Sequence, residues 1–207
     1  MELSEALRRR RMVRRYDPDR PVAAAALESV LAAARRAPSA GFTQGVSLLV
    51  LDTPPARQAF WAATALPGAD PHRPSRWLAG MRTAPVLVLV WTSRDAYLDR
   101  YAEPDKGWSD RDPERWSAPY WFVDAGMAAM AALLAAVDAG LGACFFGVPA
   151  SRVQAVRAAF GVPGDQLSVG ALSLGHPAPD ARAGGSAARR ARRPAEDLVH
   201  RGRWSSP

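Results

Sequence analysis

Two short segments near the N-terminus carry side chains that could bind a phosphate and a planar ring. The first is Arg8 to Pro18, RRRRMVRRYDP, and the second is Ala37 to Gln44, APSAGFTQ. Guanidinium groups grip phosphate oxygens through paired donors, whereas the second segment offers a hydroxyl, an amide and free backbone N–H groups. Together the two segments predict a site for a phosphate that carries an aromatic ring.

The arginines of the first segment are expected at the end of a helix. Leu3 and Leu7 have the spacing of one helical face, which predicts a helix from Glu2 to Arg11. Arg10 and Arg14 are four residues apart and could then direct two forks at one phosphate. A solvated basic face on an amphipathic helix is the alternative that this motif leaves open.

Other kinds of site find little support in the chain. His72, His176 and His200 lie far apart without a metal-ligand spacing, so no metal site is predicted. Cys144, the single cysteine, falls in an apolar run and is expected to be a small buried side chain. No G-x-S-x-G, Walker A or G-x-G-x-x-G motif follows an expected strand, which argues against hydrolases, P-loop enzymes and Rossmann dehydrogenases.

Length and composition are those of one globular domain. The chain has 207 residues, of which 48% are hydrophobic and 23% charged. Its net charge of +7 comes almost entirely from arginine, with Lys106 the only lysine. The charge permits a nucleic-acid-binding protein that uses Arg8 to Arg15 and Arg182 to Arg193 as basic patches, although a G+C-rich genome would produce the same bias.

The N-terminus and the cysteine count favour a cytoplasmic protein without a membrane segment. Charged residues begin the chain and no apolar signal region follows, while one cysteine excludes an internal disulfide. The most apolar stretch, Ala125 to Val137, is too short to span a bilayer. We expect it to lie in a helix, Tyr120 to Gly140, that is apolar around most of its circumference and buried on all sides.

Hydrophobic periodicity predicts strands separated by helices, which is typical of a layered α/β or α+β fold. The expected strands are Val46 to Leu51, Pro85 to Trp91, Gly142 to Val148 and Gln166 to Leu174. Besides those above, the expected helices are Ala23 to Ala37, Pro55 to Thr64, Ser75 to Arg82 and Pro149 to Phe160.

The stretch from Arg94 to Pro119 is long, polar and interrupted by prolines, so a loop is expected there. It contains Tyr97, Tyr101, Trp108 and Trp116. Long loops in compact domains often act as lids, which makes the aromatic side chains candidate substrate contacts. A surface excursion held together by its own tryptophans is the equally supported alternative.

Five segments in family order resemble the nitroreductase family of FMN-dependent oxidoreductases. The family's R-x-S-x-R/K motif before an aromatic-Asp turn resembles Arg10 to Asp17, and its A-P-S-x-x-N-x-Q-P-W segment resembles Ala37 to Val46. Its G-L-G-x-x-x-x-G and L-x-L-G-x-P elements resemble Gly140 to Gly147 and Leu172 to Pro177, and its closing segment resembles Arg193 to Trp204.

The resemblance implies one α+β domain over residues 1–207 with a three-layer fold, in which helices flank a central, mainly antiparallel sheet. It also implies an intertwined homodimer with the flavin between the subunits. Residues 94–119 would form a lid or insertion, 181–193 a linker and 194–207 a C-terminal arm exchanged between subunits. The helix Tyr120 to Gly140 is the natural candidate for the interface.

The resemblance further implies a bound FMN that supplies the chemistry without a catalytic side chain. Arginines of the first segment and of the arm would hold the phosphate, and a backbone N–H near Gly147 would hydrogen-bond the flavin nitrogen that accepts hydride. The implied FMN contacts are Arg10, Arg11, Met12, Arg14, Pro38, Ser39, Ala40, Gln44, Phe145, Phe146, Gly147, Arg201 and Arg203.

The implied reaction is ping-pong: NAD(P)H reduces the flavin and leaves, and a small nitroaromatic, quinone or other conjugated acceptor then takes its place. Three departures from the motifs affect which acceptor is expected. Met12 replaces the serine, Phe42 replaces the asparagine, and Gly45-Val46 replaces the Pro-Trp pair. Phe42 is therefore expected in the substrate pocket, together with Trp108 and Trp116 of the expected lid. A specialised FMN-dependent dehydrogenase or an oxygen-using biosynthetic flavoenzyme is the alternative within the same scaffold.

Overall fold

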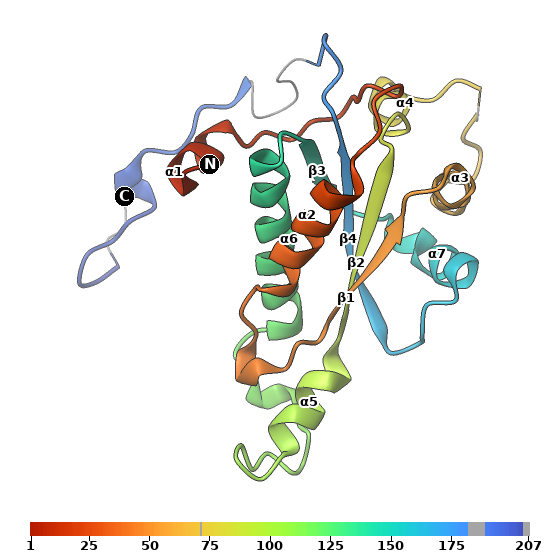
Figure 1. Ribbon diagram of the computed structural model, residues 1–207. Coiled ribbons are helices and arrows are strands. Elements are labelled where there is room, and N and C mark those ends of the chain that lie inside the picture. The colour runs from red at the N-terminus through yellow and green to blue at the C-terminus, as the bar shows by residue number, and fades with distance from the viewer. Residues whose placement is uncertain (71, 182–188, 205–207) are drawn as a thin grey trace.

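A four-stranded antiparallel sheet lies between two layers of helices in the computed structural model, which describes residues 1–70, 72–181 and 189–204 (Figure 1). The strand order across the sheet is β1-β2-β4-β3, so that β1 and β3 form its two edges. The strands are β1 (Val46–Leu51), β2 (Val86–Ser93), β3 (Gly142–Phe146) and β4 (Gln166–Gly175). The predicted three-layer α+β fold is confirmed.

The central strand β2 is buried on both faces, which explains its uninterrupted apolar sequence. Successive side chains of a strand point to opposite faces. Val86, Val88 and Val90 accordingly join one core cluster, while Leu87, Leu89 and Trp91 join the other. Each face of the sheet therefore requires its own cover of helices.

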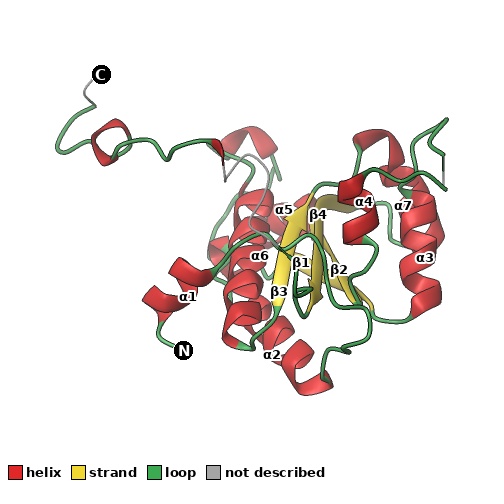
Figure 2. Cartoon of the chain, turned by 90° about the horizontal axis from the view of Figure 1, so that it is seen from above, coloured by secondary structure: helices red, strands yellow, loops and turns green. Residues whose placement is uncertain are grey.

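Helices cover both faces of the sheet (Figures 1 and 2). Apolar side chains of α2 and α6 pack over the valines of β2, and those of α3, α4 and α7 contribute to the opposite cluster. The helices in chain order are α1 (Leu3–Arg9), α2 (Ala24–Arg35), α3 (Pro54–Ala63), α4 (Arg76–Met81), α5 (Arg94–Ala102), α6 (Tyr120–Asp138) and α7 (Val153–Phe160).

The first helix is shorter than predicted, and this changes the geometry of the arginines. α1 ends at Arg9, and Arg10 already has extended backbone angles, φ −57° and ψ 122°. The chain leaves the helix because the N–H of Val13 donates to the carbonyl of Ala143 at 2.9 Å, at the edge of β3. Arg10 and Arg14 therefore do not share a helical face.

The prediction of a loop from Arg94 to Pro119 is wrong in its first third, which forms α5. The Ser93 side chain caps this helix by accepting from the Ala96 N–H at 3.3 Å, and Asp95 adds a negative charge in the first turn. The remainder is irregular except for a short 3-10 turn, Pro113–Arg115. The prolines after residue 103 led to the prediction of a loop, although Ser93 and Asp95 are a typical signal for the start of a helix.

The long helix α6 is buried on one side only, which corrects the expectation of burial all round. Ala125, Ala132 and Ala136 lie against α2 and the sheet, whereas Val123 and Met127 are 45% and 38% exposed. Among the described residues, α6 is the one helix long and apolar enough to cross a bilayer. Its packing in the protein core, however, is that of a core helix.

The other elements agree with the sequence to within a few residues. The helix expected from Pro149 to Phe160 is a 3-10 turn, Ala150–Arg152, followed by α7. The C-terminal segment has a further 3-10 turn, Ala195–Asp197, and runs away from the sheet (Figures 1 and 2). Most of the expected linker, residues 182–188, lies outside the described residues.

Candidate functional site

The arginine-rich segment lies along the free edge of β3 in extended form. Met12 makes a parallel bridge with Ala143, and Tyr16 makes an antiparallel bridge with Pro177. The buried Tyr16 hydroxyl donates to the Val13 carbonyl at 2.6 Å and lies 2.7 Å from the Ser173 hydroxyl. These contacts fix the path of the chain between Met12 and Tyr16.

Arg10, Met12 and Arg14 follow one another at a spacing of two residues in this segment. In an extended chain, residues i, i+2 and i+4 share a side, so Arg10 and Arg14 share one although their Cα atoms are about 13 Å apart. Gly80 permits this course because a Cβ there would lie 2.3 Å from the Arg14 carbonyl oxygen. The helical spacing from which the sequence paired these arginines is therefore absent, and their pairing now depends on the alternation of an extended segment.

A cleft of about 260 Å³ opens between this segment, the end of α6 and the start of β3. Arg14 lies close to β3: burial raises the pKa of the Cys144 thiol, and the Arg14 guanidinium partly opposes that shift. A buried thiol with a raised pKa is a poor nucleophile, as the sequence predicted. The cleft is lined by Arg9, Arg11, Val13, Val137, Gly140, Leu141, Gly142 and Pro177.

Beyond Ala143 the edge of β3 offers backbone groups that point away from the sheet. The Ala143 carbonyl faces outward, since it accepts from Val13, and the alternation of a strand turns Phe145 outward as well. Gly147 follows directly, and a Cβ there would meet no atom within 4 Å. On the α3 side, the Phe146 ring stacks on Trp61 with centroids 5.8 Å apart. Open backbone donors therefore adjoin the half-buried Phe146, whose ring packs on the buried Trp61.

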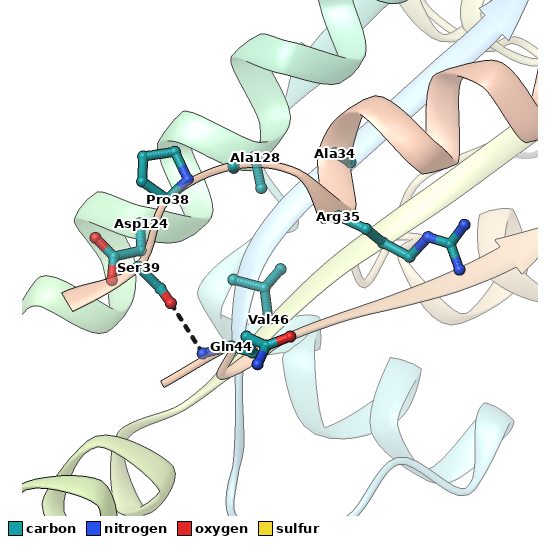
Figure 3. A pocket seen from close by; sticks show the side chains of 9 residues that line it. Ala34, Arg35, Pro38, Ser39, Gln44, Val46, Asp124 and Ala128 are labelled. Carbon is teal, nitrogen blue, oxygen red and sulfur yellow. Dashed lines mark hydrogen bonds between the residues drawn. The ribbon is translucent and has the colours of Figure 1, made fainter. Parts of the chain in front are cut away.

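The second polar segment forms a tight corner between α2 and β1, which we call the 38–44 corner (Figure 3). The Ser39 hydroxyl accepts from the Gln44 N–H at 2.9 Å, and the Asp124 carboxylate of α6 accepts from the Ala40 N–H at 2.8 Å. Phe42 and Gln44 have φ of 56° and 55°. Such left-handed angles cost about 1–3 kcal/mol per non-glycine residue and persist only where neighbouring contacts impose them.

The 38–44 corner borders a second cleft, of about 230 Å³, at the N-terminal half of α6 (Figure 3). Its polar side chains are Arg35, Ser39, Gln44 and Asp124. Its other lining residues are Ala34, Ala37, Pro38, Val46 and Ala128.

The two predicted halves of the phosphate-and-ring site do not meet within one chain. Asp124 binds the 38–44 corner near the start of α6, and Val137 lines the arginine cleft near its end. Their separation along the helix axis is about 20 Å. Arg201 and Arg203 are exposed in a segment that runs away from the sheet. One chain by itself therefore assembles only partial sites.

The two tryptophans expected at the substrate pocket are engaged with one another. Trp108 and Trp116 have ring centroids 5.4 Å apart, and Tyr101 lies within 4.9 Å of both. These contacts favour a segment pinned by its own aromatic side chains over a lid that presents them to a ligand. Phe42, in contrast, is 75% exposed at the 38–44 corner.

Sequence reasoning missed Asp124 and Arg100, both of which hold the 38–44 corner. The Arg100 Nε donates to the Gly41 carbonyl at 2.8 Å, and Asp124 is 2% exposed. A carboxylate at the start of an apolar helix was a usable signal, because a buried charge requires partners. No cluster of metal-ligating side chains occurs among the described residues.

The model of one protein family matches residues 7–176, and its description is the nitroreductase family. The chain belongs to the nitroreductase family. This assignment makes it an oxidoreductase and agrees with the resemblance of the first four sequence segments, whereas the closing segment, Arg193 to Trp204, lies outside the matched residues. No curated protein matches the chain.

Many solved structures share this nitroreductase fold. A protein from Desulfovibrio desulfuricans, classed as a nitroreductase and solved in complex with FMN, is 25% identical, with a TM-score of 0.70 over 99% of each chain. A similarly classed FMN complex from Exiguobacterium sibiricum is 21% identical, with a TM-score of 0.73 over 99% of this chain and 98% of that one. A Clostridium acetobutylicum protein classed as an NADH oxidase is 20% identical, with a TM-score of 0.66 over 98% and 100%.

Proposed function

We propose that this nitroreductase-family protein is an FMN-dependent NAD(P)H oxidoreductase that reduces nitroaromatic, quinone or other conjugated acceptors by a ping-pong reaction. The observation that carries the proposal is the pairing of arginines with open backbone donors along the edge of β3. FMN complexes of two relatives with this fold support the identity of the cofactor.

The residues present fit the chemistry of FMN. Arg10, Arg11 and Arg14 supply cations for a phosphate, and outward backbone groups at Phe145 and Gly147 suit the polar edge of a flavin ring. The open space at Gly147 lets a planar ring approach the backbone closely. Met12 offers no hydroxyl to the phosphate, so the arginines must carry that binding.

A homodimer would bring the two halves of the site together. The 38–44 corner and the arginine segment lie against α6 at points about 20 Å apart on one chain, so a single flavin contacts both only if a second subunit supplies one of them. The exposed apolar face of α6, with Val123 and Met127, provides a surface for that contact. Ser39, Ala40 and Gln44 would then face the flavin held by the partner's arginines.

When bound, FMN would take a pair of electrons with a proton from NAD(P)H and deliver them to the acceptor. The protein's own part is to bind and orient. A backbone N–H at Gly147 would hold the ring nitrogen that changes charge, and the aromatic wall of Phe146 and Trp61 would exclude water. Phe42 would border the open face where donor and acceptor alternate.

The test is the visible absorption spectrum of the purified protein, followed by mass identification of the molecule released on denaturation. FMN bands that bleach on addition of NADH or NADPH and return with a nitroaromatic or quinone are expected. Stopped-flow mixing of the reduced protein with oxygen then separates a reductase from an oxygen-using enzyme. A colourless protein that FMN does not stabilise would refute the proposal.

A further inference from the structure

We propose that Asp124 is a positioning residue that clamps the 38–44 corner in its flavin-facing conformation. This inference deepens the proposed function and rests on it for the identity of the ligand. The clamp itself rests on contacts within one chain. Through one carboxylate oxygen, Asp124 joins three parts of the fold: α6, the corner and α5.

The bonding of Asp124 is unusual for a residue on an otherwise apolar helix. Its Oδ2 accepts from the Ala40 N–H and from the Tyr97 hydroxyl, both at 2.8 Å, and the residue is 2% exposed. A buried carboxylate must be hydrogen-bonded, and bonds to a charged acceptor are about twice as strong as neutral ones. The corner and α5 therefore supply the donors that this charge requires.

The 38–44 corner needs an external clamp because its own backbone is strained. Gly41, Phe42 and Gln44 have positive φ within four residues. Inside the corner, the Thr43 hydroxyl donates to the Ala40 carbonyl and the Ser39 hydroxyl accepts from Gln44. Asp124 adds the bond that ties Ala40 to the core of the protein, so its loss would release the centre of the corner.

Residues of α5 also contact the corner and hold it from the side opposite α6. Arg100 donates to the Gly41 carbonyl, and its guanidinium donates two further bonds to the Asp105 carboxylate at 2.7 and 2.8 Å. Cβ atoms at Gly41 and Gly45 would lie 2.7 Å from Tyr101 and 2.6 Å from Tyr97. The aromatic cluster of residues 97–121 thus packs closely against the corner and supports it.

The clamp also explains where the exposed side chains of the corner point. Ser39 and Gln44 border the same cleft as Asp124 (Figure 3). Phe42 is 75% exposed to solvent. With Ala40 fixed to α6, these side chains hold their directions before a ligand arrives. Preorganisation of this kind lowers the ordering cost of binding.

The experiment compares Asp124→Ala, Asp124→Asn and Tyr97→Phe with the unchanged protein, and uses Glu28→Gln as the charge control. Glu28 is exposed on α2, so this substitution removes one carboxylate without changing the corner. Hydrogen exchange of the Ala40 amide is measured without flavin, and the FMN dissociation constant and the visible circular dichroism of bound FMN are measured separately. The thermal unfolding midpoint of each variant is measured as well.

We expect Asp124→Ala to accelerate exchange at Ala40 at least about tenfold, to weaken FMN about 10- to 100-fold and to change the flavin dichroism. Asp124→Asn, which keeps an acceptor oxygen, should recover most of each loss. Tyr97→Phe leaves the Ala40 bond and should show a smaller change. Glu28→Gln should match the unchanged protein.

Unaltered Ala40 exchange in Asp124→Ala would overturn the clamp. If the alanine variant does not fold, Asp124→Leu, which keeps the branched shape without an acceptor oxygen, takes its place, and unaltered Ala40 exchange in that variant would overturn the clamp. A loss of thermal stability with unchanged flavin affinity and dichroism would overturn its positioning role. If the unchanged protein binds no FMN, the proposed function fails, while the exchange measurement still decides whether Asp124 holds the corner.

Discussion

At the scale of residues, the arginines beside β3 carry the proposed phosphate contacts. Alternation along an extended segment puts Arg10 and Arg14 on the same side, and Arg14 also lies near Cys144. Because hydrogen bonds to charged groups contribute about 1.5–3 kcal/mol each, the pair is expected to dominate the affinity for the phosphate.

The variant Arg10→Ala with Arg14→Ala should therefore lose its flavin. We expect the FMN dissociation constant to rise at least about 100-fold, measured by flavin fluorescence during titration. Arg8→Ala with Arg94→Ala, which removes the same charge from exposed positions, is the control. Full retention of flavin by the first variant would contradict the assignment.

Tyr16 is the residue that ties the arginine segment to the sheet. Its hydroxyl donates to the Val13 carbonyl and contacts Ser173, and burial raises its pKa well above the ordinary value of 10.0. Burial and the Asp124 bond raise the pKa of Tyr97 in the same direction. Both phenols therefore stay protonated in the folded protein at pH values where the unfolded chain ionises.

An alkaline loss of stability follows from these two phenols. Their contribution is complete below pH 10 and is lost as the pH rises above 10, because only the unfolded state then releases the protons. Urea unfolding between pH 8 and 11 should show this decline. Tyr16→Phe should decline less steeply, after losing about 1–2 kcal/mol at pH 8, and an equally steep decline would refute this origin.

At the scale of elements, the closing segment from Arg193 to Trp204 is exposed along most of its length. It runs away from the sheet, and Arg201 and Arg203 are exposed. A segment without an intramolecular cover is expected to find its contacts on a partner subunit, as the arm of the family resemblance implies.

A chain ending at Arg192 should consequently dimerise less well and bind less FMN. Light scattering coupled to size exclusion measures the first effect, and absorbance at the flavin bands measures the second. Arg201→Ala with Arg203→Ala keeps the arm but removes its cations, so it should weaken FMN while the elution volume stays constant. An unchanged volume and absorbance for the shortened chain would count against the arm.

At the scale of the whole molecule, the exposed face of α6 explains how two partial sites could become complete. Val123 and Met127 lie one turn apart and are 45% and 38% exposed, while the opposite face packs on α2. An apolar face of this kind on a core helix is typical of a protein–protein interface.

Met127→Glu should therefore produce a monomer that has lost its FMN, since a buried charge at an interface lacks a partner. Leu66→Glu, at a site 53% exposed on a loop away from α6, is the matched control and should remain dimeric. Sedimentation velocity distinguishes the two species. A dimeric Met127→Glu protein with its full flavin content would exclude α6 from the interface.

The amino-acid sequence by itself determined the strands and the helix faces of this protein, because burial on two faces requires continuous apolar runs such as Val86 to Trp91. It also located the polar segments through their residue types. The tertiary structure decided that Arg10 to Tyr16 is extended, that α5 begins the presumed lid and that Asp124 clamps the 38–44 corner. These features depend on partners far away in the chain, the edge of β3 and a buried carboxylate on α6, and local sequence patterns carry no record of such partners.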